Sequence, residues 1–121
     1  MINKRSIGEW GEKLAVKFLE KQGITILEKN FRCKIGEIDI IAKEKEYLVF
    51  IEVKYRKNLS RGYPREAVNY YKQRTISKVA LWYIQKYKLW DKPCRFDVLE
   101  ILGEYPNLKI TLIRNAFYPI L

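Results

Sequence analysis

Charged residues interrupt the two most apolar strand-like stretches of the sequence, which lie in GEIDIIAKEKEYLVFIEVKYR at residues 36–56. Runs of Ile, Val, Phe and Tyr favour strands, and the charged segment at 43–46 favours a turn between them. A strand with near-continuous apolar character is usually covered on both faces. Because a buried carboxylate is costly without a compensating cation, Asp39 and Glu52 need a partner. The sequence therefore predicts a covered hairpin that carries a functional site.

The pattern along the rest of the chain predicts helices around a central sheet. Apolar residues recur at three- and four-residue intervals in two segments, which is typical of helices with one buried face. Other segments are rich in β-branched and aromatic residues and are bounded by turn formers, as strands are. The expected elements are a helix at 6–22, a strand at 24–32, hairpin strands at 36–42 and 47–55, a basic loop at 56–64, a helix from Pro64 to about residue 87, and strands at 95–101 and 108–114.

This order, α-β-β-β-α-β-β, indicates an α/β fold with a central mixed β-sheet flanked by helices. The chain has 121 residues and no linker-like segment, so we expect a single domain over residues 1–121. Trp10 on the first helix is expected in the core. On the second helix the residues expected to face inward are Val68, Tyr71, Thr75, Val79 and Trp82.

Composition removes several classes of chemistry. The chain contains no histidine, which excludes Ser-His-Asp and Cys-His catalysis and histidine-ligated metals. Cys33 and Cys94 lie in no metal-binding pattern, so reduced thiols are expected and a zinc site is not. No apolar stretch is long enough to span a bilayer, and the N-terminus has no secretion signal. We therefore expect a soluble, cytoplasmic protein that does not contact a membrane.

Basic residues give the chain a net charge of +10 and a pI near 9.6, which indicates a polyanionic partner. Several of them follow the hairpin directly or lie on the second helix outside its apolar stripe. Such residues can contact a phosphate backbone without reading sequence. The alternative is that they only keep the surface solvated. The expected nucleic-acid-binding residues are Arg56, Lys57, Arg61, Lys72, Arg74 and Lys78.

Asp39, Glu52 and Lys54 are expected to lie together on the hairpin. Residues i and i+2 of a strand share a face, so Glu52 and Lys54 project together. Counting outward from the turn places Asp39 opposite residue 50 or 51, within a residue or two of Glu52. Two carboxylates so close repel each other, and a divalent cation such as Mg²⁺ turns that repulsion into a binding site. Such a cation stabilises charge on a phosphate, while a lysine positions an attacking water.

A third carboxylate, Glu12, lies at the margin of the apolar stripe of the first helix, from which it can lean toward the hairpin. The alternative for the hairpin charges is a surface salt bridge, which contributes about 0–1 kcal/mol. Because the carboxylates interrupt apolar runs instead of alternating with other polar residues, the pattern favours a site.

An acidic residue on one strand followed by Glu-x-Lys on the next, here Asp39 and then Glu52-Val53-Lys54, resembles the PD-(D/E)xK nuclease motif. The chain as a whole resembles the bacterial YraN-type family, which is assigned the restriction-endonuclease-like fold. It is also similar to the archaeal Holliday-junction resolvases. The stretches that carry the resemblance to the YraN-type family are GEWGEKLAVKFLEKQG (8–23), NFR (30–32), GEIDIIA (36–42), VFIEVKYR (49–56), RFDV (95–98) and NAF (115–117).

The resemblance implies a role for each matching residue. Asp39, Glu52 and the backbone carbonyl of Val53 would hold Mg²⁺ or Mn²⁺. Lys54 would orient the nucleophilic water or the scissile phosphate, and Glu12 would be an auxiliary acidic residue near the metal.

Three positions of this sequence lack a match to such nucleases. Ile38 stands where the general motif has proline, and Ala80 stands where RecB-type exonucleases have tyrosine. Glu37 belongs to the GEID signature of the family but has no counterpart in the general motif, so its role stays open.

The function implied is metal-dependent endonucleolytic hydrolysis of DNA phosphodiesters in repair or recombination. The substrate implied is branched or otherwise structured DNA, and the likeness to resolvases implies a homodimer that works beside repair or recombination proteins. An alternative is a nucleic-acid-binding module of a repair complex with weak or no cleavage activity. A third hypothesis is a structural domain whose hairpin carries a surface salt bridge.

Overall fold

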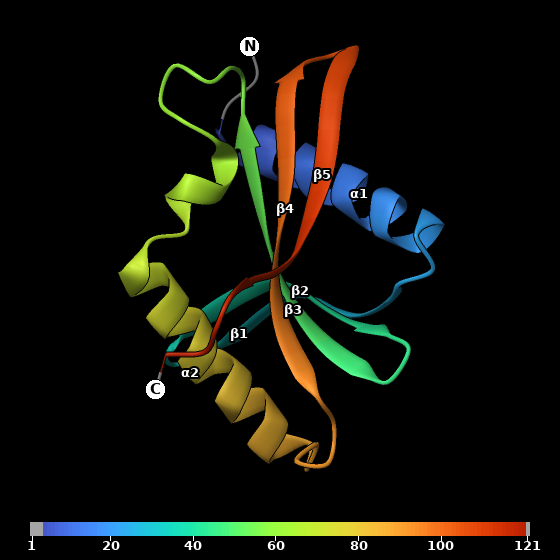
Figure 1. Cartoon of the computed structure of the whole chain (residues 1–121), viewed down its shortest axis with the longest axis vertical. Helices are drawn as coiled ribbons and strands as arrows, with labels where there is room; N and C mark the ends of the chain where they lie inside the picture. The colour runs from blue at the N-terminus through green and yellow to red at the C-terminus, as the bar shows by residue number, and fades with distance from the viewer. Residues whose placement is uncertain (1–3, 121) are drawn as a thin grey trace.

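Five strands form one mixed β-sheet, and an α-helix packs on each of its faces (Figure 1). The computed structural model describes residues 4–120. The observed order confirms the expected α-β-β-β-α-β-β arrangement and is consistent with a restriction-endonuclease-like fold. The elements are α1 (Lys4–Lys21), β1 (Thr25–Cys33), β2 (Gly36–Glu44), β3 (Tyr47–Arg56), the 3-10 helix η1 (Pro64–Ala67), α2 (Tyr70–Lys86), β4 (Cys94–Glu104) and β5 (Asn107–Phe117).

The sheet order is β1-β2-β3-β4-β5, and of its neighbouring strands only β3 and β4 run parallel. Parallel neighbours need a crossover connection, and the segment containing η1 and α2 supplies it. Strong twist makes the strands cross at a narrow waist in Figure 1 and fan apart above and below it, with α1 behind the sheet and α2 in front.

Two apolar clusters hold the helices on the sheet. Ala15 and Leu19 of α1 pack with Ile51 of β3 in one cluster. Val79 of α2 packs with Phe50 of β3 in the other. Adjacent strand residues point to opposite faces, so consecutive positions of β3 supply the two clusters in turn. Burial on both faces explains why this strand reads as a near-continuous apolar run.

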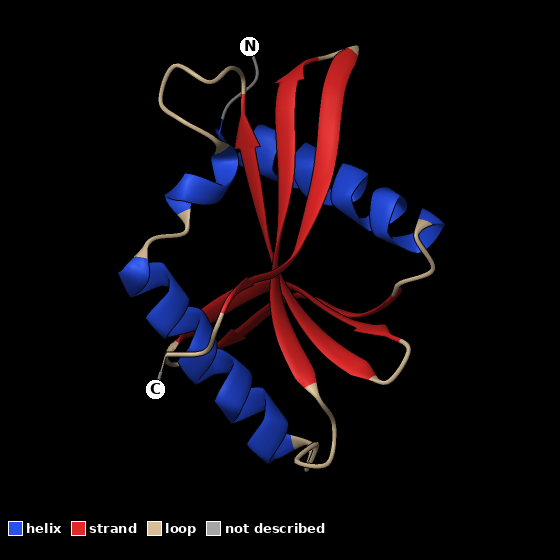
Figure 2. Cartoon of the chain, in the orientation of Figure 1, coloured by secondary structure: helices blue, strands red, loops and turns tan. Residues whose placement is uncertain are grey.

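The segment expected to be one long helix from Pro64 consists of two helical pieces (Figure 2). Pro64 does begin a helical turn, but that turn is the short η1. Asn69 then caps the start of α2, because its side chain accepts a hydrogen bond from the first turn. Arg65 fixes η1 separately by donating hydrogen bonds to Glu100 of β4. The prediction of a continuous helix is therefore wrong, because capping and a tertiary contact divide it.

The break also changes which residues of α2 face the core. The helical phase restarts at the break, so a stripe extrapolated from Val68 is rotated away from the buried face of α2 and meets that face only at Val79. Val79 is buried as expected, whereas Tyr71 and Trp82 are exposed. The buried residues of α2 are Ile76, Ser77, Val79, Ala80 and Tyr83.

In the described part of the chain, no helix is long and apolar enough to cross a membrane.

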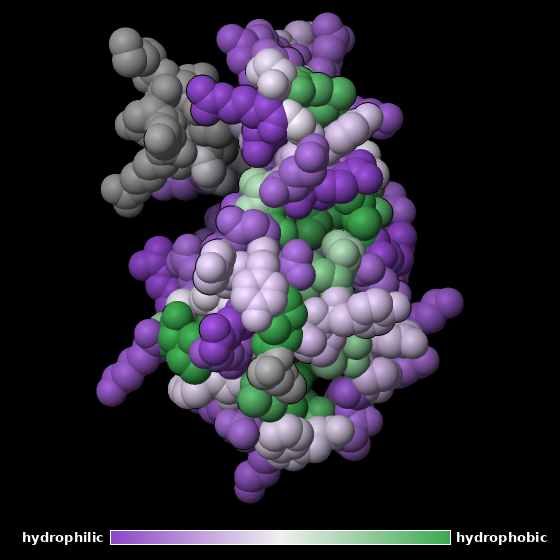
Figure 3. Space-filling model, turned by 60° about the vertical axis from the view of Figure 1, so that its left-hand side comes forward, coloured by the Kyte–Doolittle hydropathy of each residue, from purple (hydrophilic) through white to green (hydrophobic). Residues whose placement is uncertain are grey.

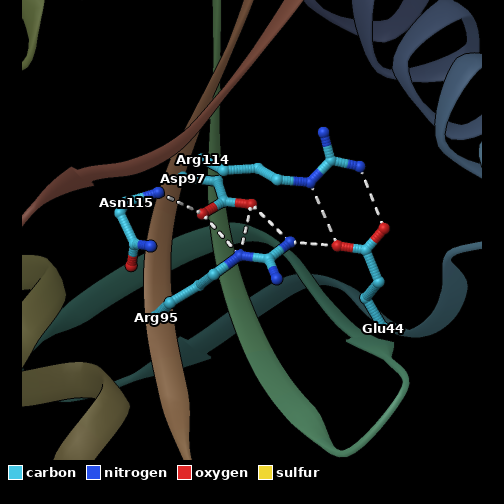
Figure 4. A network of polar contacts seen from close by, with 5 residues as sticks. All are labelled: Glu44, Arg95, Asp97, Arg114 and Asn115. Carbon is cyan, nitrogen blue, oxygen red and sulfur yellow. Dashed lines mark hydrogen bonds and ion pairs between the residues drawn. The ribbon is translucent and has the colours of Figure 1, made fainter.

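A buried ionic network ties the end of β2 to β4 and β5 (Figure 4). Asp97 is fully buried and accepts hydrogen bonds from the Arg95 guanidinium and from the backbone N–H of Asn115. Arg95 and Arg114 both donate to Glu44. The hydrogen bond from Arg114, helped by Arg95, lowers the pKa of Glu44 to about 2. The RFDV and NAF stretches thus include residues that join strands.

Replacing Asp97 by Asn should destabilise the fold by about 2 kcal/mol or more, because it removes one of the two carboxylates that bind the buried Arg95 guanidinium and leaves only Glu44 to compensate its charge. Urea unfolding measures this loss. The matched control is Glu104→Gln, which removes an exposed carboxylate 3.2 Å from Lys57 Nζ and should cost no more than about 1 kcal/mol. Equal losses in the two variants would contradict the structural importance of the network.

Candidate active site

The two hairpin carboxylates lie where the pairing of β2 with β3 ends. The last residue pair of that ladder is Ile40 with Ile51. Beyond it, the backbone N–H of Asp39 donates to Glu52 Oε1 at 3.4 Å, and the N–H of Val53 donates to Asp39 Oδ2 at 2.8 Å. Side-chain oxygens thus replace carbonyl oxygens as the acceptors at this point. The observed register, continued by one position, places Asp39 directly opposite Glu52. Counting from the turn predicted an offset of one or two residues between them.

The backbone of β2 turns over at Asp39. Ile38 packs in the cluster under α2, whereas Ile40 packs in the cluster under α1. In a regular strand these two residues would share a face. The change of face explains how Asp39 sits between the two sides of the sheet. Two isoleucines flank the position in the sequence, so their hydrophobicity alone gave no sign of the change.

Glu52 is a buried carboxylate with an unsatisfied oxygen. Its residue surface is 1% exposed, and Oε2 has no hydrogen-bond partner among the described residues. Lys72 Nζ lies 3.5 Å from this oxygen, close enough for an ion pair but without hydrogen-bond geometry. Burial and then the neighbouring charge of Asp39 raise the pKa of Glu52 to about 7, against the opposing charges of Lys72 and Lys54.

Asp39 lines a pocket of about 480 Å³ between α1 and β3. Glu12, Val53 and Lys54 line the same pocket. Burial raises the pKa of Asp39, and the hydrogen bond from Val53 N–H opposes that rise. Four of the predicted catalytic and metal-binding residues therefore border one cavity, with Glu52 directly beside them. The pocket leaves room for a phosphate or a water beside Asp39, whereas Glu52 is buried and does not border it.

Glu12 is held at the edge of this pocket by a residue that sequence reasoning missed. Asn30 Nδ2 of β1 donates a hydrogen bond to Glu12 Oε2 at 2.9 Å. Asn30 has φ of 52°, a left-handed conformation that asparagine tolerates better than most residues. An asparagine inside an otherwise strand-like run, in the NFR stretch, was the available signal. Glu37 lies elsewhere, in an exposed ion pair with Arg32.

The six basic residues expected to bind nucleic acid fall into three groups. Arg56, Lys57 and Arg61 border a hollow of about 230 Å³ in the loop after β3. Lys72 reaches Glu52 instead of projecting freely, a contact that no spacing in the sequence indicated. The remaining two are exposed on α2 and are Arg74 and Lys78.

The oxygen atoms that could hold a hard divalent cation are those of Asp39, Glu52 and the Val53 carbonyl. Within residues 4–120, no group of three or more acidic, cysteine or histidine side chains is arranged to hold a metal ion. Mg²⁺ usually takes one or two carboxylates and keeps several waters, so two carboxylates can suit it. The unsatisfied Glu52 Oε2 and the raised pKa values of both carboxyl groups fit a site that gains from an added positive charge.

Glu52→Gln should stabilise the metal-free protein at neutral and higher pH. The folded protein raises the pKa of Glu52 from 4.5 to about 7. Its contribution to stability is therefore present below the unfolded pKa and is lost as the pH rises through the folded pKa. The gain should reach about 3 kcal/mol near pH 8.5 and should nearly vanish near pH 4.

Urea unfolding in EDTA at these two pH values measures the difference between Glu52→Gln and the unmodified protein. Glu37→Gln, which alters an exposed carboxylate on β2, should show no such pH-dependent gain. A loss of stability in Glu52→Gln near pH 8.5 would mean that the charge of Glu52 is compensated in the fold.

Proteins that share one family name match nearly the whole chain. The model of the Uncharacterised protein family UPF0102 matches residues 11–101. A UPF0102 protein of Caldicellulosiruptor saccharolyticus is 50% identical over 118 residues, covering 96% of this chain and 100% of that protein. One from Clostridioides difficile is 47% identical over 116 residues, with the same coverage of both chains. The chain therefore belongs to the Uncharacterised protein family UPF0102, the YraN-type family that its motifs resemble.

Proposed function

We propose that this protein is a metal-dependent endonuclease that hydrolyses DNA phosphodiesters, on branched or otherwise structured DNA. The observation that supports it best is the pair of carboxylates at the end of the β2–β3 ladder, Asp39 half-buried and Glu52 buried with one oxygen unsatisfied. A lysine shares the adjoining pocket with Asp39. Perturbed titratable groups beside a cavity are typical of functional sites.

The cation would be held by Asp39, Glu52 and the carbonyl of Val53. When bound, Mg²⁺ or Mn²⁺ supplies the positive charge that stabilises the phosphate in hydrolysis and makes water a better nucleophile. Lys54 borders the same pocket as Asp39, where its ammonium group can orient the attacking water or the scissile phosphate. Glu12, fixed by Asn30, is placed to accept a hydrogen bond from a water at the mouth of the pocket.

The basic residues beyond the pocket would hold the DNA backbone. Arg56 is the last residue of β3, and Lys57 and Arg61 lie in the loop after it, so all three come after Lys54 at the same end of the strand. A preference for branched DNA, a homodimer and partners in repair or recombination all rest on the likeness to resolvases. A cytoplasmic location is supported by the free thiols of Cys33 and Cys94.

A nucleic-acid-binding module with weak or no cleavage is the second candidate. The observation that favours it is the ion pair of Lys72 with Glu52, which places a cationic side chain against the carboxylate without any metal. Such a module would bind DNA through its basic surface and would gain little from a divalent cation.

Incubation with labelled four-way junction, flap, single-stranded and linear duplex DNA, in Mg²⁺ or Mn²⁺, tests the proposal. We expect the unmodified protein to cleave at least one substrate, and EDTA to abolish cleavage. Asp39→Asn and Lys54→Ala should each lower the rate by about 100-fold or more, since groups that act on the water or the phosphate contribute effects of that size.

Glu37→Gln is the matched control, because Glu37 lies two residues before Asp39 on β2 but is exposed and paired with Arg32. It should keep the activity of the unmodified protein. Circular dichroism checks that every variant is folded. Tight binding without cleavage of any substrate would instead favour the binding module, and cleavage that survives in Asp39→Asn would refute this site.

A further inference from the structure

Three exposed tyrosines lie in the segment that runs from the residue before η1 to the first turn of α2. The exposed fractions are 47% for Tyr63, 55% for Tyr70 and 76% for Tyr71. Single exposed apolar or aromatic residues are common and need no explanation. These three occur within nine residues of the chain, on the side of the molecule where η1 and the start of α2 lie (Figure 1). Figure 3 looks toward this side, where strongly hydrophilic residues lie among residues of intermediate hydropathy and smaller hydrophobic patches.

Contacts hold these rings in place. Tyr70 and Tyr71 form an edge-to-face pair with ring centroids 5.6 Å apart. The Arg65 guanidinium lies 4.7 Å from the centre of the Tyr63 ring. A ring that is already held loses less conformational freedom when a ligand binds, so binding retains more of the interaction energy.

Both ends of the segment are fixed to the strands that carry the candidate active site. Lys72, next to Tyr71 in the chain, lies 3.5 Å from Glu52 Oε2. Arg65 binds both carboxylate oxygens of Glu100, at 2.8 and 2.9 Å. Glu100 pairs with Lys54 across the β3–β4 ladder. Lys72 and Arg65 therefore tie this stretch of chain to β3 at Glu52 and to β4 at Glu100.

The chemistry of this surface selects the ligand. Exposed aromatic faces bind flat π-systems, and the net charge of +10 favours a polyanion. A single nucleic-acid strand offers both, because its bases are free to stack while its phosphates meet basic side chains. Bases inside a duplex already stack on each other and cannot reach these rings without unpairing.

We propose that Tyr63, Tyr70 and Tyr71 form a stacking surface for unpaired bases beside Asp39 and Glu52. The substrate class is then DNA with a single-stranded segment next to the scissile phosphate, as at a flap or an opened branch point. The position of cleavage in this statement rests on the proposed nuclease function. The binding of unpaired bases does not depend on it.

Fluorescence anisotropy with a labelled oligothymidylate and a blunt duplex of equal length tests the inference, in EDTA and at one fixed salt concentration. The double variant Tyr70→Ala/Tyr71→Ala should lose at least about tenfold in affinity for the single strand, since stacking on one base is worth about 1–3 kcal/mol. Its affinity for the duplex should change less than about threefold. Tyr70→Phe/Tyr71→Phe, which keeps the rings, should bind the single strand like the unmodified protein.

The matched control is Trp90→Ala, because Trp90 is an aromatic residue with 61% exposure that follows the opposite end of α2. It should leave both affinities unchanged. The single variant Tyr71→Ala removes the most exposed ring of the three and serves if the double variant does not fold.

Unchanged single-strand binding in the alanine variants would overturn the inference and would leave a protein as the partner of these rings. An equal loss for single strand and duplex would also overturn it, since stacking would then not be the cause. EDTA prevents metal-dependent cleavage, so the result is separate from the nuclease test. Single-strand binding through the tyrosines without any cleavage would refute the nuclease alone.

Discussion

Two hydrogen bonds at Asp39, from its own N–H to Glu52 Oε1 and from the Val53 N–H to Asp39 Oδ2, determine how the central hairpin can be used. Up to Ile40 and Ile51, β2 and β3 pair as an ordinary antiparallel ladder. At the next position the carboxylates take the place of backbone acceptors, so the strands no longer pair through their main chains. A ladder that ends inside the fold leaves space between the strands and α1, and the pocket lies there. The same carboxylates that end the pairing therefore border the cavity that the separation creates.

Two of the buried acidic residues of the sheet, Asp97 of β4 and Glu52 of β3, differ in how their charge is compensated. Asp97 is surrounded by donors from Arg95 and Asn115, so its charge is satisfied within the fold. Glu52 is buried to the same degree, yet one of its oxygens lacks a hydrogen bond. Buried polar groups are nearly always satisfied, so an exception calls for a reason. The satisfied carboxylate, Asp97, joins strands, whereas the unsatisfied one, Glu52, belongs to the site for which we propose a function.

Local patterns in the sequence were sufficient for the sheet but not for the connection between β3 and β4. Apolar strand runs and a charged turn predicted the hairpin, and the motif predicted which carboxylates meet. The break before α2 depends on Asn69 capping and on Arg65 reaching Glu100, 35 residues away in the chain. No periodicity in the sequence reports such a contact. The wrong inward face at Tyr71 followed from that missing break.

Site residues that depend on long-range geometry were missed for a similar reason. The contact of Asn30 with Glu12 joins β1 to α1, and the contact of Lys72 with Glu52 joins α2 to β3. Asn30 differs from its neighbours only as an asparagine inside a strand-like run, and the sequence around Lys72 gives no indication of its contact. Only the packing of both helices against the sheet brings their side chains to the carboxylates.

Lys72 also bears on the choice between the two candidate functions. Its ammonium group lies beside Glu52 Oε2, and Lys54 adds a second positive charge nearby. If these two charges fully offset the burial of the carboxylates, neither pKa would be raised. Both are raised, that of Glu52 to about 7. Burial and the repulsion between the two carboxylates therefore raise their pKa values more than the two lysines lower them. A divalent cation would supply further positive charge, which favours the metal-dependent enzyme over a binding surface that never holds a metal.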